Sequence, residues 1–166
     1  MALRSIRSKL ALALAMTVLS SVGVIASTAG AAQAACPDGG YTSTPGERIK
    51  GPNNDTVYMV DPEGLKRPIV GAGAYLWFFR SWEGIKVRND ISCVKSANLD
   101  LSFSSFLAQD GYGSYYFVEP YGTNNYHARG IPSVAVYDKY FFRWDHAQYV
   151  DQAWLLAHAQ GVRAWT

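Results

Sequence analysis

The pattern of apolar and polar positions predicts short β-strands through most of the chain after residue 46. Runs rich in β-branched, aromatic or aliphatic residues are expected to form strands at 47–50, 56–60, 65–70 and 85–87. Turn-forming residues separate these runs, namely Gly51–Asp55 (GPNND) and Asp61–Gly64 (DPEG). In the second turn Pro62 sets one backbone dihedral and Gly64 tolerates positive φ. This part of the chain therefore predicts a small sheet of short strands.

The same order of elements is predicted a second time, because the chain repeats one stretch. Val57–Gly64 reads VYMVDPEG, and Tyr115–Gly122 reads YYFVEPYG, 58 positions later. A second echo, between Phe78-Phe79-Arg80 and Phe141-Phe142-Arg143, is offset by 63 positions. The five additional residues fall between the two echoes, where we expect them to lengthen a surface loop. The second set of strands is expected at 103–107, 115–119 and 126–131.

Two segments have the pattern of helices. Ala72–Trp82 is an apolar, aromatic run that favours a short helix over the sheet, although a strand fits its periodicity nearly as well. Asp145–Gln160 is predicted as an amphipathic C-terminal helix that begins at Asp145 or Asp151 and ends before Gly161. Its expected apolar stripe consists of Val150, Ala153, Trp154, Leu156 and Ala157.

The first 35 residues have the features of a secretory signal peptide. Arg4, Arg7 and Lys9 precede a long uncharged run that ends in the small residues 32–35 (AQAA). The alternatives are an uncleaved membrane anchor and a lipid anchor on Cys36. We therefore expect a secreted or cell-surface protein whose mature chain has no transmembrane segment.

Removal of this leader changes the charge balance. The whole chain has 15 Lys and Arg against 13 Asp and Glu, and three of the basic residues lie in the leader. The mature chain is therefore close to neutral and offers no basic surface for a nucleic acid, so we expect no nucleic-acid partner. About 131 residues remain, which is enough for one ordinary domain or for two very small ones that share a core.

The chain has two cysteines, Cys36 and Cys93, and both belong to the mature part. In an oxidising compartment an isolated pair is expected to form a disulfide, which would tie the mature N-terminus to the end of the first repeat. The alternative is a thiolate nucleophile at Cys93, which would need a neighbouring histidine and an unpaired Cys36.

Together these features predict an α+β fold of two tandem β-rich repeats that share one core. Each repeat is expected to have short antiparallel strands and a short helix, and a C-terminal helix follows the second. The expected division is a signal peptide at 1–35, an extended segment at 36–46, a first repeat at 47–98 and a second repeat with the C-terminal helix at 103–166.

The first repeat resembles a module found in many bacterial secreted and surface proteins. The resemblance rests on VYMVDPEGLKRPI (Val57–Ile69), the aromatic run that ends in Phe and Trp, the Val-containing strand and the Asp-started half-turn. The module has the form VYxV, a turn, KR-x-IP, aromatic residues, a Val strand and a short helix, and no activity is generally assigned to it. This chain departs from it in Lys66–Val70 (KRPIV), while the second copy keeps Ile131-Pro132-Ser133 without the Lys-Arg pair.

Residues that could carry catalysis are few. His127, His146 and His158 lack the spacing of three or four residues with which a helical pair shares one zinc ion. Asp61 and Glu119 occupy equivalent repeat positions and could act as a glycosidase pair, but each precedes a proline, where we expect turn-forming carboxylates. No catalytic residue, metal site or cofactor is predicted.

The chain is also rich in aromatic residues, with 11 Tyr, 7 Phe and 5 Trp. Flat aromatic faces pack against the apolar face of sugars, although a small β-rich protein also fills its core with aromatics. The candidate ligand-binding aromatics are Trp77, Trp82, Tyr121, Tyr126 and Trp144.

Three functions fit these observations. The first is a non-catalytic secreted module that binds a cell-wall polymer or another extracellular partner. The second is a small hydrolase of cell-wall or glycan material. The third is a secreted inhibitor or toxin that presents a loop such as Tyr121–Gly130 to an extracellular protein.

Overall fold

The computed structural model describes residues 36, 39–123, 125–159 and 163–166. The predicted signal peptide and Gly161, the expected end of the last helix, lie outside the described residues. No helix within the described ranges is long and apolar enough to span a bilayer.

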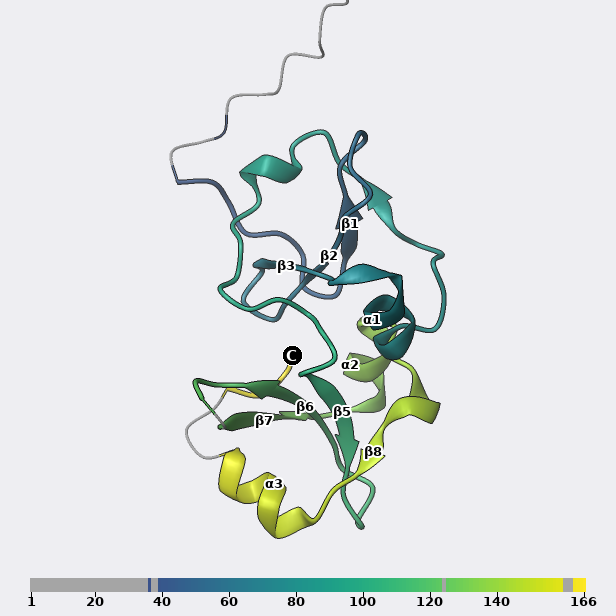
Figure 1. The fold of residues 1–166 in the computed structure, drawn as a ribbon, viewed down its shortest axis with the longest axis vertical. Helices are drawn as coiled ribbons and strands as arrows, with labels where there is room; N and C mark the ends of the chain where they lie inside the picture. Colours follow the sequence, from purple (N-terminus) through teal and green to yellow (C-terminus); the bar gives the residue numbers. More distant parts are fainter. Residues whose placement is uncertain (1–35, 37–38, 124, 160–162) are drawn as a thin grey trace, which may run out of the picture. The chain divides into compact units, whose positions relative to one another are not determined.

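The first half of the mature chain forms a four-stranded mixed sheet (Figure 1). Its strands are β1 (Arg48–Lys50), β2 (Val57–Val60), β3 (Lys66–Pro68) and β4 (Lys86–Val87), in the order β3-β2-β1-β4. The first three strands are antiparallel, and β4 returns parallel to β1 after the helix α1 (Gly71–Phe78). The short helix η1 (Ile91–Cys93) follows β4. The aromatic run at 72–82 therefore forms a helix as far as Phe78, and its remaining residues are not helical.

The second half forms another four-stranded mixed sheet with the same order of pairing. Its strands are β5 (Phe106–Gln109), β6 (Tyr115–Pro120), β7 (Tyr126–Ile131) and β8 (Gln148–Tyr149), in the order β7-β6-β5-β8. Again three strands are antiparallel and the fourth is parallel to the first. The helices of this half are α2 (Val134–Lys139), η2 (Trp144–His146) and α3 (Gln152–His158). The α+β prediction is confirmed at this level, with two sheets and a C-terminal helix.

Turn chemistry explains where the hairpin between β2 and β3 reverses. The Oδ1 atom of Asp61 accepts hydrogen bonds from the backbone N–H groups of Glu63 (3.0 Å) and Leu65 (2.9 Å). Gly64 has a φ of 78°, and a Cβ at this position would lie 2.8 Å from the carbonyl oxygen of Ser43. The DPEG turn therefore depends on its first carboxylate and on its glycine.

The five additional residues of the second half do not lengthen a surface loop. The β6–β7 hairpin instead continues for two further residue pairs, Glu119↔His127 and Pro120↔Tyr126, beyond the pair that matches Val60↔Lys66. An extension of two residues on each strand keeps every side chain on its original face of the sheet. The remaining residue is accommodated near Phe141, whose φ of 62° is the one positive value among the described non-glycine residues.

The C-terminal helix is shorter than predicted. Residues 145–150 form the end of η2 and the strand β8, and α3 begins after Asp151, whose side chain accepts a hydrogen bond from the N–H of Trp154 (3.1 Å). The predicted apolar stripe is wrong at Ala153, Leu156 and Ala157, which are exposed, whereas Val150 and Trp154 pack against the core as predicted. Leu155 is the buried residue, and it packs against β5, β6 and β7. Gln148 and Tyr149, which the apolar periodicity predicted to be helical, instead form the strand β8 and pair with β5.

The two Phe-Phe-Arg segments that echo each other in the sequence pair with each other in space. Phe79 and Phe142 form an isolated antiparallel bridge. The N–H of Arg80 donates to the carbonyl of Phe141 (3.2 Å), and the N–H of Arg143 donates to the carbonyl of Phe78 (2.9 Å). These reciprocal hydrogen bonds connect the ends of the segments that follow α1 and α2.

The largest cluster of buried apolar side chains contains residues from both sheets. The ring of Phe142 stacks on Phe79 (centroids 5.9 Å apart) and on Phe117 (5.8 Å), and Phe117 also stacks on Trp165 (4.1 Å). All four rings have no exposed surface. Burial of large aromatic side chains is the main favourable contribution to a core of this size.

The predicted disulfide between Cys36 and Cys93 is present, with the two Cα atoms 5.1 Å apart. We expect replacement of both cysteines by serine to lower the free energy of unfolding by roughly 4 kcal/mol, because the crosslink restricts the unfolded chain. Urea unfolding of the mature protein and of the double Ser variant would measure this loss. Equal stability of the two proteins would contradict the expectation, and a reducing agent should affect only the protein with cysteines.

Candidate functional site

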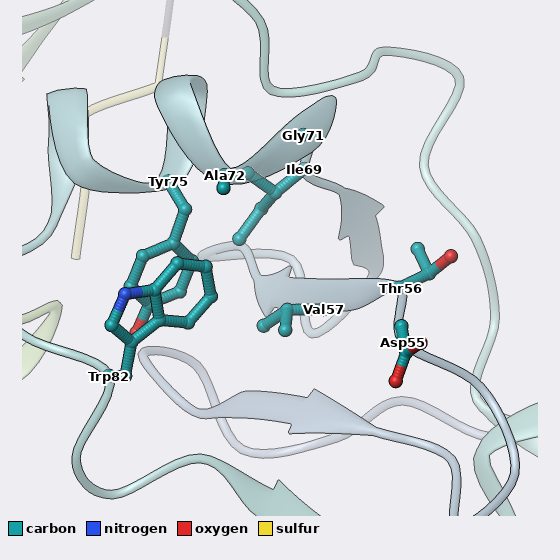
Figure 2. A pocket seen from close by; sticks show the side chains of 8 residues that line it. All are labelled: Asp55, Thr56, Val57, Ile69, Gly71, Ala72, Tyr75 and Trp82. Carbon is teal, nitrogen blue, oxygen red and sulfur yellow. The ribbon is translucent and has the colours of Figure 1, made fainter.

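A groove of about 370 Å³ opens beside the first sheet (Figure 2). One side consists of Val57, the first residue of β2, and the two residues before it, Asp55 and Thr56. Ile69, which follows β3, and the start of α1 supply another side. Tyr75 of α1 and Trp82 form the aromatic wall. The groove therefore has an apolar floor, an aromatic wall and one carboxylate.

The aromatic wall is a stacked pair of rings. The centroids of Tyr75 and Trp82 lie 3.8 Å apart, and the ring planes differ by 6°. Tyr75 is 1% exposed, whereas Trp82 is 46% exposed. One face of the indole thus rests on a buried ring, and the other parts of the indole remain accessible to a ligand.

A buried arginine holds this wall in place. Arg48, 5% exposed, donates hydrogen bonds to the carbonyl oxygens of Ser81 (2.7 Å) and Glu83 (2.5 Å), on either side of Trp82. It also donates to the hydroxyl of Tyr75 (2.5 Å), which in turn donates to the carbonyl of Ser81 (2.8 Å). Burial raises the pKa of Tyr75, and the charge of Arg48 only partly opposes this effect. The phenol therefore stays neutral and remains a donor in this arrangement.

The polar side of the groove is open to solvent. The side chain of Asp55 is fully exposed, and its nearest cation is Lys50 at 3.9 Å. The backbone N–H of Thr56 donates to the side chain of Asn54 (2.8 Å), which keeps this corner of the turn ordered. Asp55 and the Thr56 hydroxyl are suitable partners for the hydroxyl or amide groups of a ligand.

Of the five aromatic residues predicted from the sequence, Trp82 alone lines this groove. Trp82 lines the groove, whereas Trp144 stacks on Tyr137 in the second half (centroids 4.0 Å apart). The other three pair with different neighbours: Trp77 with Phe103 and His146, Tyr121 with His127, and Tyr126 with Phe106 and Trp154. Trp82 is therefore the residue of this set around which the groove is built.

The two carboxylates considered for glycosidase chemistry meet at one arginine. The Nε of Arg67 donates to Asp61 (2.9 Å), and its Nη1 donates to Glu119. Asp61 is 1% exposed and Glu119 is 5% exposed. Burial alone would lower the pKa of Arg67, but the adjacent carboxylates of Glu119 and Asp61 raise it. Glu119 is not a turn residue as predicted, because it lies within β6.

A second arginine completes this ion-pair network. Arg129 donates to the carboxylate of Glu63 (2.6 and 3.2 Å) and lies 3.6 Å from Glu119. Burial alone would raise the pKa of Glu63, but the hydrogen bonds and charge of Arg129 lower it overall. The indole of Trp165 covers both guanidinium groups, at 4.9 Å from Arg129 and 5.6 Å from Arg67. Each carboxylate of the network is paired with an arginine, which is the arrangement expected of an ion-pair network that stabilises the fold.

The histidines are engaged in local contacts. The Nδ1 atoms of His146 and His158 lie 2.9 and 2.7 Å from the carbonyl oxygens of Trp77 and Trp154. His127 stacks on Tyr121, with ring centroids 4.0 Å apart. Within the described ranges, no group of three or more His, Cys, Asp or Glu side chains is placed to hold a metal ion.

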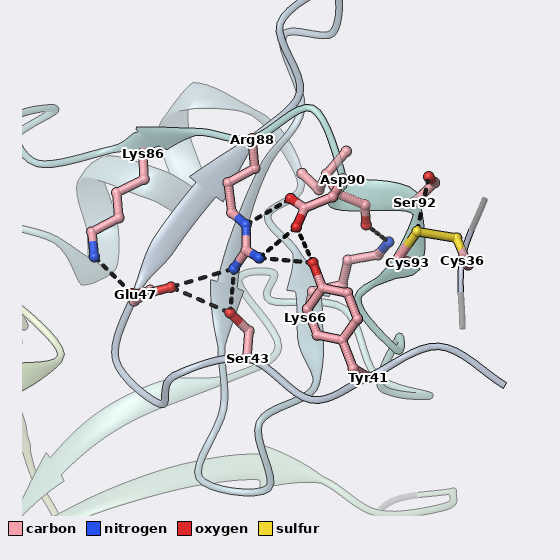
Figure 3. A network of polar contacts seen from close by, with 11 residues as sticks. Cys36, Tyr41, Ser43, Glu47, Lys66, Lys86, Arg88, Asp90, Ser92 and Cys93 are labelled. Carbon is pink, nitrogen blue, oxygen red and sulfur yellow. Dashed lines mark hydrogen bonds and ion pairs between the residues drawn. A yellow bond between two sulfur atoms is a disulfide. The ribbon is translucent and has the colours of Figure 1, made fainter. Parts of the chain in front are cut away.

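A third polar cluster anchors the segment that follows the disulfide (Figure 3). The guanidinium of Arg88 donates to Asp90 (2.9 Å), Ser43 (2.6 Å) and the hydroxyl of Tyr41 (2.8 Å). Tyr41 in turn donates to Asp90, and its backbone pairs with the chain beside Cys93. Hydrogen bonds from Arg88 and Tyr41 hold the pKa of Asp90 well below its usual range.

Comparisons with known proteins do not assign the chain to a family. No family model matches the chain, and searches among curated proteins and among solved structures find no significant match. The resemblance to a repeat module of secreted proteins therefore stays a prediction.

The ion-pair network predicts that Arg67→Met lowers the free energy of unfolding much more than Lys86→Met does. Arg67→Met leaves buried Asp61 without its arginine and leaves Glu119 with Arg129 alone, so we expect a loss of about 3–5 kcal/mol in the free energy of unfolding. Lys86→Met removes an exposed pair with Glu47 (2.7 Å) and should cost less than about 1 kcal/mol. Urea unfolding at pH 7 measures both values.

Similar small losses in the two variants would contradict the predicted role of Arg67. If Arg67→Met does not fold, the double variant Arg67→Met/Glu119→Gln provides the test. Removing the charge of Glu119 should restore folding in part, so the double variant should show a cooperative urea transition that Arg67→Met lacks.

The Asp90 cluster predicts an acid-dependent contribution to stability. Because the pKa of Asp90 is lowered on folding, its contribution is complete above the ordinary aspartate pKa of about 3.9 and is lost as the pH falls toward the folded value. The free energy of unfolding of the wild type should therefore fall more steeply between about pH 4 and pH 2 than that of Asp90→Asn. Asp55→Asn, which changes an exposed carboxylate, is the control, and parallel curves for all three proteins would contradict the prediction.

Proposed function

We propose that the protein is a secreted, non-catalytic module that binds a cell-wall or other extracellular polysaccharide, and that the Trp82 groove is its binding site. The observation that carries this proposal is the half-exposed indole of Trp82, stacked on buried Tyr75 and held by Arg48. A rigid aromatic face needs no reordering on binding, which lowers the entropic cost of holding a ligand.

The chemistry of the groove suits a sugar ring. The apolar C–H face of a pyranose packs on an aromatic ring, while the edges of the sugar carry hydroxyl or acetamido groups. Trp82 supplies the ring, and Asp55 and Thr56 supply polar atoms on the opposite side of the groove. Among polysaccharides, β-1,4-linked chains such as chitin, cellulose and the peptidoglycan backbone have all ring substituents equatorial, so they present the flattest faces.

The same observations weigh against the other two hypotheses. The carboxylates proposed for a hydrolase, Asp61 and Glu119, are buried and bound to Arg67, so neither is poised to transfer a proton to a substrate. Half of the loop proposed for an inhibitor, Tyr121–Gly130, is not a loop, because residues 126–130 belong to the strand β7. A non-catalytic module requires neither feature.

We also infer that the two sheets are copies of one module. Two observations support this inference: both sheets have the same strand order, and their central strands, β2 and β6, begin at the start of the two copies of the repeated stretch. Arg129 pairs with Phe117 as Arg67 pairs with Met59, so the second copy keeps the arginine of the Lys-Arg pair and has Ala128 in place of Lys66. The basic pair of the first copy is consequently assigned to structure rather than to a ligand.

The proposal predicts that Trp82→Ala loses binding. We expect about tenfold weaker retention on insoluble chitin, cellulose or peptidoglycan, since removal of one stacking ring costs on the order of 1.4 kcal/mol. Tyr121→Ala removes another exposed aromatic ring that does not line the groove, and it should bind as the wild type does. Sedimentation of the protein with each polymer measures the bound fraction, and thermal unfolding checks that both variants fold.

Absence of the wild type from all three pellets would refute the proposal. Equal retention of Trp82→Ala and the wild type would place any binding elsewhere on the protein.

A further inference from the structure

A second groove of about 480 Å³ lies beside the second sheet. Its lining includes Ser114, Tyr115, Ile131, Ser133 and Val134, which come from the start of β6, the end of β7 and the start of α2. None of the aromatic residues selected from the sequence lines this groove, so sequence reasoning missed it.

The second groove occupies the position that the Trp82 groove occupies in the first sheet. Strand pairing sets the correspondence, because the N–H of Ile69 donates to the carbonyl of Val57 (3.0 Å) in the first sheet and Tyr115 pairs with Ile131 in the second. Val57 thus corresponds to Tyr115, and Ile69 corresponds to Ile131. Each groove is open between the central strand of a sheet and the helix that follows the third strand.

The stacked aromatic pair is also present in both halves. Trp144 stacks on Tyr137 (4.0 Å, 18°) as Trp82 stacks on Tyr75. The hydroxyl of Tyr137 donates to the carbonyl of Arg143, the residue before Trp144 (2.7 Å), as Tyr75 donates to the residue before Trp82. The ring of Tyr115 meets Trp144 edge to face, with centroids 5.1 Å apart, so it connects this pair to the groove.

We propose that the second groove is a second sugar-binding site of the same protein. The inference rests on the proposed function, since it assigns the same class of ligand to both grooves. Tyr115 presents a half-buried aromatic ring in place of Val57, and Ser133 adds a hydroxyl near the position of Gly71. The second groove therefore has an aromatic surface and hydroxyl groups of its own.

The two sites differ in charge. The turn before β2 places Asp55 in the first groove, whereas Gly113 holds the corresponding place in the second. The second site is lined by neutral residues and fits an uncharged sugar, whereas the first can also accept an amino sugar at its carboxylate. Two sites on one chain increase retention on a polymer, because the second contact is intramolecular once the first has formed.

One substitution in each groove tests the two proposed sites individually. Ala72 in α1 and Val134 in α2 are exposed residues at corresponding positions in the first turn of each helix. Glutamate at either position is compatible with a helix N-terminus and places a charged side chain in the groove. Ala72→Glu should therefore block the first groove, and Val134→Glu should block the second, while both variants fold.

Isothermal titration of the mature protein with cellotetraose and with chitotetraose, run separately, tests the proposal. We expect two sites per chain in the wild type, one in each single variant and none in the double variant. On an insoluble polymer, each single variant should lose about tenfold or more in retention.

A single site that Ala72→Glu abolishes and Val134→Glu leaves unchanged would overturn the second groove and leave the proposed function intact. Absence of binding by the wild type to both sugars and to all three polymers would overturn both proposals. Two sites that persist in Val134→Glu would show that the second site lies elsewhere, which also refutes this assignment.

Discussion

The buried contact of Arg67 with both Asp61 and Glu119 is the interaction on which the arrangement of the two sheets depends. Arg67 and Asp61 belong to the first half of the chain, and Glu119 belongs to the second. Charges taken out of water are tolerated only when each one is paired and hydrogen-bonded. The relative position of the two halves is thus constrained more narrowly than apolar packing alone would require, because a shift of β6 would strand a buried charge.

This constraint extends to both grooves through the central strands. Val57 at the start of β2 lines the first groove, and Asp61 follows the end of the same strand. Tyr115 at the start of β6 lines the second groove, and Glu119 lies near its end. Each central strand therefore carries a network residue at one end and a groove residue at the other. The ion-pair network therefore holds each central strand at the end opposite its groove residue.

The sequence was sufficient to predict most of the strands and the disulfide, but not the contacts between the halves. The echo of VYMVDPEG located the central strands, and the cysteine count predicted the disulfide. Periodicity failed at 145–150, because pairing of β8 with β5 overrides a local helical pattern. The network was missed because a carboxylate before proline has the same local pattern whether it organises a turn, as Asp61 does, or reaches an arginine 52 positions away, as Glu119 does. Only tertiary structure distinguishes the two.

The hydrogen bonds of Arg48 favour a contact surface at Trp82 more strongly than the number of aromatic residues does. Small β-rich proteins bury aromatic rings to fill a core, and Tyr75 fulfils that role at 1% exposure. Trp82 does not, because nearly half of it faces solvent. Yet a buried guanidinium donates to the carbonyls on both sides of Trp82, and such a group must recover a large desolvation cost through its hydrogen bonds. A buried charge that immobilises an exposed indole favours a prearranged contact surface over a residue left outside the core by chance.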